Sequence, residues 1–191
     1  MLILCSAVVV ARQNPQSAPL TDAALRKAAQ DGDMPTVKDL LAKGANVNAK
    51  DESGQTALLW VAPARDNPEM IKLLIAKGAD VNAKDNQGTN ALMIAASQSN
   101  PGILAELLAA GADINAQNSE GGTALMAAAF RANLDEIKIL LAKNADLALK
   151  DKQGRTALDV AKDGAGNYTD ETNKKRFAET FKLLELSIPG K

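Results

Sequence analysis

The sequence predicts an all-α protein, an α-solenoid in which helix-turn-helix repeats stack side by side. Three markers share a period of about 33 residues: an Ala-Leu pair, a pair of large aliphatic residues, and a Gly-Ala pair. Composition agrees, because 46% of the residues are hydrophobic but only 3% are aromatic, which favours closely packed helices over a β-sandwich. The Ala-Leu pairs begin at Ala24, Ala57, Ala91, Ala124 and Ala157.

Each repeat is predicted to hold two short helices and a loop. Thr56 is a typical N-cap of the first helix, because its hydroxyl can accept a hydrogen bond from a free backbone N–H. Asn67 and Pro68 are typical of the start of the second helix, which we expect to end at Gly78 in a left-handed C-cap. The residues that follow are rich in Asn, Asp and Gly and predict a short β-hairpin loop.

Five such repeats are predicted, and the two end repeats differ from the middle ones, as the caps of a solenoid should. The last repeat carries about ten extra residues near 163–174, which we interpret as an exposed loop from Gly164 to Asp170 before a closing helix. The predicted repeats cover residues 22–50, 51–84, 85–117, 118–150 and 151–188.

These repeats resemble the ankyrin repeat family. The strings LLAKGANVNAKD (40–51) and LIAKGADVNAKD (74–85) are similar to the family's helix end and hairpin. The Thr-Pro-Leu-His signature is present in divergent form, with Ala for Pro and without His, as in Thr56-Ala57-Leu58-Leu59. The resemblance implies a single ankyrin repeat domain over residues 21–188, with lower local stability where the signature His is lost.

The resemblance also implies a function, since ankyrin repeats bind partner proteins in a concave groove of hairpin tips and first helices. Phe130 and Arg131 are the preferred anchors, because aromatic residues and Arg are enriched among interface hot spots. Trp60 is expected to lie in the core instead. The residues expected to bind the partner are Glu52, Gln55, Arg65, Asn86, Gln87, Thr89, Gln98, Glu120, Phe130, Arg131, Lys152 and Arg155.

Composition argues against several other functions. With 22 basic and 23 acidic residues the net charge is −1, so nucleic acid is a poor candidate partner. The chain has no His and only one Cys, Cys5, which leaves no His-based catalysis, no disulfide within the chain and no Cys-based zinc site. We therefore expect no catalytic residues, no metal, no cofactor and a monomeric protein. An enzyme that uses a pair of carboxylates is the alternative. The carboxylates recur with the repeat period on the hairpins, however, and this pattern is typical of solvated or capping groups and not of one converging acid pair.

Residues 1–20 are expected to lie outside the domain. The apolar run from Leu2 to Ala11 is too short to span a bilayer, which takes about 20 apolar residues. Its length fits the core of a secretory signal, although no Lys or Arg precedes it. An exported accessory or effector ankyrin protein, periplasmic or secreted, is thus an alternative description. A disordered tail is the other interpretation of this segment.

Overall fold

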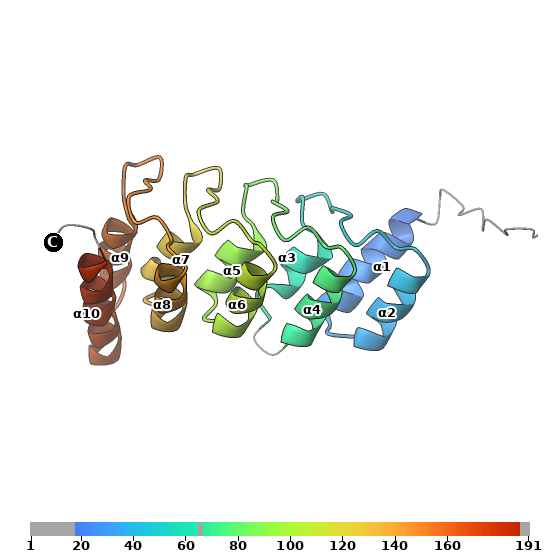
Figure 1. Ribbon diagram of the computed structural model, residues 1–191, viewed down its shortest axis with the longest axis horizontal. Helices are drawn as coiled ribbons and strands as arrows, with labels where there is room; N and C mark the ends of the chain where they lie inside the picture. The colour runs from blue at the N-terminus through green and yellow to red at the C-terminus, as the bar shows by residue number, and fades with distance from the viewer. Residues whose placement is uncertain (1–17, 65–66, 188–191) are drawn as a thin grey trace, which may run out of the picture.

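The computed structural model describes residues 18–64 and 67–187, which form ten helices in five antiparallel pairs. The pairs lie side by side along one axis, and the loops between them project on one side (Figure 1). The fold class predicted from the sequence, a solenoid of stacked helix-turn-helix repeats, is therefore confirmed. The helices are α1 (Ala18–Gln30), α2 (Met34–Ala42), α3 (Ala57–Val61), α4 (Pro68–Ala76), α5 (Ala91–Ser97), α6 (Pro101–Ala109), α7 (Ala124–Phe130), α8 (Leu134–Ala142), α9 (Ala157–Ala165) and α10 (Glu171–Leu186).

The odd-numbered helices form one layer and the even-numbered helices a second layer. Helices α3, α5 and α7 begin with an Ala-Leu pair, and every residue of those pairs is almost completely buried. Alanine lets neighbouring helices approach closely, while leucines and isoleucines of the second layer fill the space between repeats. Each repeat thus covers the apolar flank of the next one.

The ends of the helices follow the predicted capping chemistry. The side chain of Thr123 accepts a hydrogen bond from the N–H of Met126, and Asn67 does the same for Met70 at the start of α4. Gly78 follows α4 with a positive φ of 87°, and Asn144 takes the equivalent place after α8 with a φ of 61°. Only residues that tolerate the left-handed backbone conformation, such as Gly and Asn, fit these two positions.

The loops that project from the stack are hairpin-like turns without strands. In the third repeat an isolated bridge joins Lys84 to Asn90 in antiparallel fashion. We call the turns at residues 51–55, 85–89, 118–122 and 151–155 the fingers. In the first of them the N–H of Asp51 donates to the carbonyl of Gln55, and the other fingers repeat this bond.

The extra residues of the last repeat do not form the predicted loop from Gly164. Gly164 lies inside α9 and is buried, and α10 begins at Glu171 rather than near Lys175. Gly164 is needed there because a Cβ at this position would collide with the carbonyl of Phe130 in α7. Most of the extra residues therefore lengthen two helices, and only residues 166–170 connect them.

Two other expectations are corrected. Trp60 does not lie in the core: it is partly buried, and its indole N–H donates to Asp51 Oδ2 at 3.0 Å. Helix α1 begins at Ala18, so the last three residues of the segment expected outside the domain are helical. The remainder of that segment, residues 1–17, lies outside the described residues.

Candidate functional site

The fingers and the first-layer helices enclose a hollow of about 370 Å³ between α5, α7 and α9. We call it the groove hollow. Its floor is apolar and comes from the first helices of three successive repeats, while its polar rim comes from three fingers. It is lined by Thr89, Met93, Ile94, Ser97, Asn118, Glu120, Gly122, Thr123, Met126, Ala127, Phe130, Arg131, Asp151, Gln153, Arg155 and Val160.

Each finger is held rigid by one carboxylate or amide at its start. Asp151 Oδ1 accepts from the N–H groups of Gln153 and Arg155 at 3.0 and 2.9 Å. Asp51, Asp85 and Asn118 make the same pair of bonds in the other fingers. Side chains of Asp and Asn favour such turns because they replace a backbone acceptor. The rim of the groove is consequently preorganised before any partner binds.

Neighbouring fingers are also bonded to each other. The backbone N–H of Lys152 donates to the carbonyl of Glu120 at 2.9 Å, and Ser119 donates to Gln87 in the same way. Lys84 Nζ reaches across to the carbonyl of Gln117 at 2.9 Å. The fingers therefore form one continuous wall, so that residues from different repeats keep fixed distances from one another.

Arg155, in the last finger, is the centre of an ion-pair network that extends from the finger to Asp163 in α9. Its guanidinium contacts Asp151 and Asp163, each at 2.7 Å. The burial of Asp151 acts to raise its pKa, but hydrogen bonds from the Arg155 backbone and guanidinium outweigh this and hold the pKa below its usual 3.8. The hydrogen bonds to Asp151 and Asp163 in turn raise the pKa of Arg155. The lowered pKa keeps Asp151 ionised near neutral pH, so that it anchors the rim through Arg155.

Phe130 and Arg131 form the opposite end of the hollow. Phe130 ends α7 and is 36% exposed, and among the described residues only Leu186 is another exposed large hydrophobic side chain. The guanidinium carbon of Arg131 lies 5.8 Å from the centre of the Phe130 ring, within the range of a cation–π interaction. An exposed aromatic ring with a cation above it is therefore presented beside the apolar floor.

The repeat architecture agrees with a comparison with known families. The family model described as ankyrin repeats (three copies) matches residues 25–118 and 99–169, which together are well over half of the chain. The chain belongs to the ankyrin repeat family. No curated protein matches it closely enough to be compared. Ankyrin repeats are generally scaffolds for protein–protein interaction and are typically not catalytic, so protein partners are the expected ligands of this ankyrin protein.

The groove hollow of the ankyrin stack brings together five of the residues expected to bind the partner. They come from the C-terminal end of one first helix, α7, and from three fingers that are distant in sequence. Their shared position was predicted from the family resemblance, and the structure places all of them on one surface. These residues are Thr89, Glu120, Phe130, Arg131 and Arg155.

The other expected residues do not line the groove hollow. Asn86 is structural, because its side-chain amide donates to the carbonyl of Glu52 at 2.9 Å. Lys152 lies outside the hollow and reaches Glu120 Oε1 at 3.8 Å. Gln98 is exposed at the end of α5. Glu52, Gln55 and Gln87 belong to the first two fingers, and Glu52 lines a separate shallow hollow beside Arg26. Arg65 lies outside the described residues.

Three contributors to the site were missed from the sequence. Met93 and Met126 line the floor although each is only 4% exposed, and they occupy the place of the signature His. Their repetition at one register of successive first helices was a signal in the sequence that a common surface uses them. Asp163 was placed in the insertion near 163–174 and not in a helix, so its ion pair with Arg155, eight positions earlier, was not anticipated.

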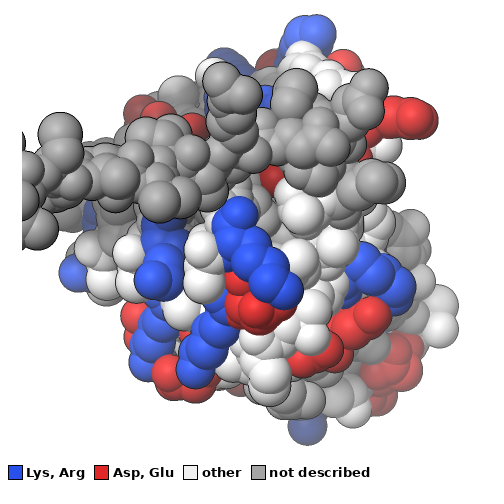
Figure 2. Space-filling model, turned by 90° about the vertical axis from the view of Figure 1, so that its right-hand side faces the viewer, with Lys and Arg blue, Asp and Glu red and all other residues white. Residues whose placement is uncertain are grey.

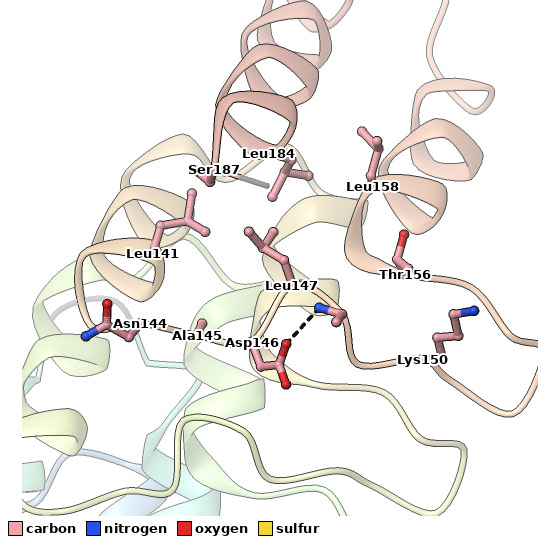
Figure 3. Close-up of a pocket in the computed structure, with 11 residues that line it drawn as sticks. Leu141, Asn144, Ala145, Asp146, Leu147, Lys150, Thr156, Leu158, Leu184 and Ser187 are labelled. Atoms are coloured by element: carbon pink, nitrogen blue, oxygen red, sulfur yellow. Dashed lines mark hydrogen bonds between the residues drawn. The ribbon is translucent and has the colours of Figure 1, made fainter. Parts of the chain in front are cut away.

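A larger hollow of about 680 Å³ lies at the C-terminal end of the described stack. Leu141, Leu147, Leu158 and Leu184 surround it and come from α8, the loop after it, α9 and α10 (Figure 3). Asp146 Oδ1 on its edge accepts from the N–H of Ala148 at 2.8 Å. This hollow lies beside the last helix pair of the described residues and is separate from the groove hollow.

Charges at the opposite end of the stack are mixed. Lys and Arg side chains lie beside Asp and Glu side chains on the face that contains α1 and α2 (Figure 2). Exposed ion pairs there join Lys27 to Asp31 and Lys43 to Asp39. Over the described ranges, no three His, Cys, Asp or Glu side chains gather as metal ligands would. Among the helices of residues 18–64 and 67–187, none is long and apolar enough to cross a membrane.

Proposed function

We propose that this protein is a non-catalytic scaffold that binds a partner protein in the groove hollow and along the adjoining fingers. Membership of the ankyrin repeat family supports a protein-binding role. The observation that supports this surface is the exposed Phe130 with Arg131 beside an apolar floor, inside a rim that the fingers hold rigid. A preorganised aromatic anchor is typical of an interaction hot spot, because little conformational freedom is lost on binding.

The test compares capture of partners by three forms of the protein. A tagged wild type, the double variant Phe130→Ala/Arg131→Ala and the control Leu186→Ala are incubated with extract, and the captured proteins are identified by mass spectrometry. Leu186 is the matched control, since it is the other exposed large hydrophobic residue in the described part and lies on α10, away from the groove. The double variant should bind the specific partner about tenfold more weakly. Equal capture by all three forms contradicts the proposal.

We also propose that the protein acts as a monomer and that its partner is not a nucleic acid. The near balance of 22 basic and 23 acidic residues supports the second statement, since binding a phosphate backbone needs a surplus of cations. Light scattering coupled to size exclusion would give a mass near 20 kDa for the monomer. A dimer mass, or salt-dependent retention of the protein on DNA, would contradict these statements.

Export to the periplasm or the outside of the cell is a second part of the proposal. It is supported by the apolar run from Leu2 to Ala11, which has the length of a secretory signal core. Fractionation of cells that express the full chain or a chain without residues 1–17 would test it. Export should be lost in the shortened chain, and equal retention of both chains in the cytoplasm contradicts export.

A further inference from the structure

The chemistry of the groove hollow differs between its two ends. At the finger end, each charged side chain that lines the hollow already has an ionic partner. Arg155 is held by Asp151 and Asp163, and Glu120 lies 3.8 Å from Lys152. These charges are largely compensated within the protein, so a ligand gains little by replacing those partners.

Arg131, at the opposite end of the hollow, is different. Across the described residues its guanidinium takes part in no ion pair, and its contact is with the ring of Phe130. It is exposed, so its donors are available to a ligand. A planar guanidinium with free donors binds a carboxylate with two parallel hydrogen bonds, and stacking on an aromatic ring helps to fix its orientation.

The floor next to Arg131 fits an apolar side chain. Met126, Ala127 and Phe130 come from the same helix, and Met93 and Ile94 face them from α5. Thioether side chains are flexible and polarisable and adapt to aliphatic or aromatic groups of different shape. With a volume of about 370 Å³, the hollow admits side chains of a peptide segment and not a folded element.

We infer that the partner presents a peptide segment in which an apolar side chain stands next to a carboxylate. The apolar side chain packs on Met126 and Phe130, and the carboxylate binds the Arg131 guanidinium. This inference rests on the proposed function and specifies which segment the groove selects. A basic segment would be repelled by Arg131, and a neutral polar segment would leave its donors without a charged acceptor.

The test uses two defined pools of fluorescein-labelled peptides. Both have Leu at the centre and random neutral positions elsewhere, with Glu on each side of the Leu in one pool and Gln in the other. Binding to the full chain is measured by fluorescence anisotropy at two salt concentrations. Wild type should bind the Glu pool about three- to fivefold more tightly than the Gln pool, with the difference shrinking at high salt.

Two charge reversals make the measurement specific. Arg131→Glu should abolish the preference for the Glu pool and weaken binding of that pool about tenfold. Lys182→Glu, on the exposed face of α10, changes the net charge equally and should leave the preference intact. Circular dichroism of both variants would verify that the helices are retained.

The outcomes distinguish the preference for an acidic segment from peptide binding in the groove hollow itself. If the two pools bind wild type equally and Arg131→Glu changes nothing, the acidic specificity is wrong while groove binding stands. If Phe130→Ala also leaves binding of both pools unchanged, or if neither pool binds wild type, peptide recognition in this hollow is itself contradicted. A loss of preference in Lys182→Glu as well would show that net charge, not Arg131, causes the effect.

Discussion

Asn90 is the residue at which local chemistry departs most clearly from the repeat pattern. It caps α5 through Oδ1, which accepts from the N–H of Met93 at 3.0 Å, and it is 1% exposed. Its side-chain Nδ2 is buried without a hydrogen-bond partner in the described structure. Thr56 and Thr123 cap the equivalent helices with a hydroxyl and leave no such amide donor. A buried donor without a partner is destabilising.

Asn90→Thr should therefore raise the free energy of unfolding by about 1 kcal/mol, because the cap is kept and the unpaired donor is removed. The reverse change at the matching position, Thr123→Asn, should lower it by a similar amount. Urea unfolding followed by circular dichroism measures both. A destabilised Asn90→Thr protein would mean that Nδ2 contributes favourably in solution.

The lowered pKa of Asp151 predicts how the stability of the folded protein depends on pH. Its pKa in the folded protein is below the usual 3.8, so its contribution is fully present above that value and is lost as pH falls through 3.8 towards the folded pKa. Stability should be constant near neutral pH and decrease below about pH 4. Lowered pKa values of Asp51, Asp159 and Asp170 act in the same direction.

Asp151→Asn should be less stable than wild type at pH 7 and lose less stability between pH 5 and pH 3, since the group no longer titrates. The turn itself should persist, because Asn118 makes the same two backbone bonds in the preceding finger. Thermal unfolding at several pH values measures this. Parallel curves for the two proteins would contradict the assignment.

At the scale of helices, the contact between α7 and α9 depends on Gly164. Any Cβ there would collide with the Phe130 carbonyl, so Gly164→Ala must push the two helices apart. We expect a loss of about 1–3 kcal/mol of stability. Gly102→Ala in α6 is the control: a Cβ at that position meets nothing within 4 Å, and alanine should be neutral or stabilising. Equal effects of the two variants in urea unfolding would be inconsistent with this packing.

The stacking of the repeats also predicts that equivalent leucines differ in how much stability is lost when each is replaced by alanine. Leu125 of α7 is 1% exposed and lies between two repeats, whereas Leu158 of α9 is partly buried and lines the hollow at the end of the stack. Leu125→Ala should cost about 3 kcal/mol, and Leu158→Ala about half as much or less, because a more exposed side chain loses less burial. A larger loss for Leu158→Ala would indicate that this hollow is filled in solution.

On the scale of the whole molecule, periodic features could be predicted from the sequence and non-periodic ones could not. The caps at Thr123, Asn67 and Gly78 depend on local chemistry that repeats, so the helices and their stacking followed from it. Gly164 was misplaced because a glycine-rich run is typical of loops, and its actual role depends on a neighbour that is 34 positions earlier. Within the site, Phe130 and Arg131 could be selected from their residue types, which are enriched among interface hot spots, but the lack of an ion pair at Arg131 depends on tertiary contacts.

Site-specific photo-crosslinking would show whether partner proteins bind in the groove hollow of this ankyrin stack. Benzoylphenylalanine is placed at position 130, and in a second protein at position 186 on α10. After illumination in the presence of partner proteins, we expect a crosslinked species of defined mass from position 130 and none from position 186. Crosslinking from position 186 alone, or equal products from both, would contradict it.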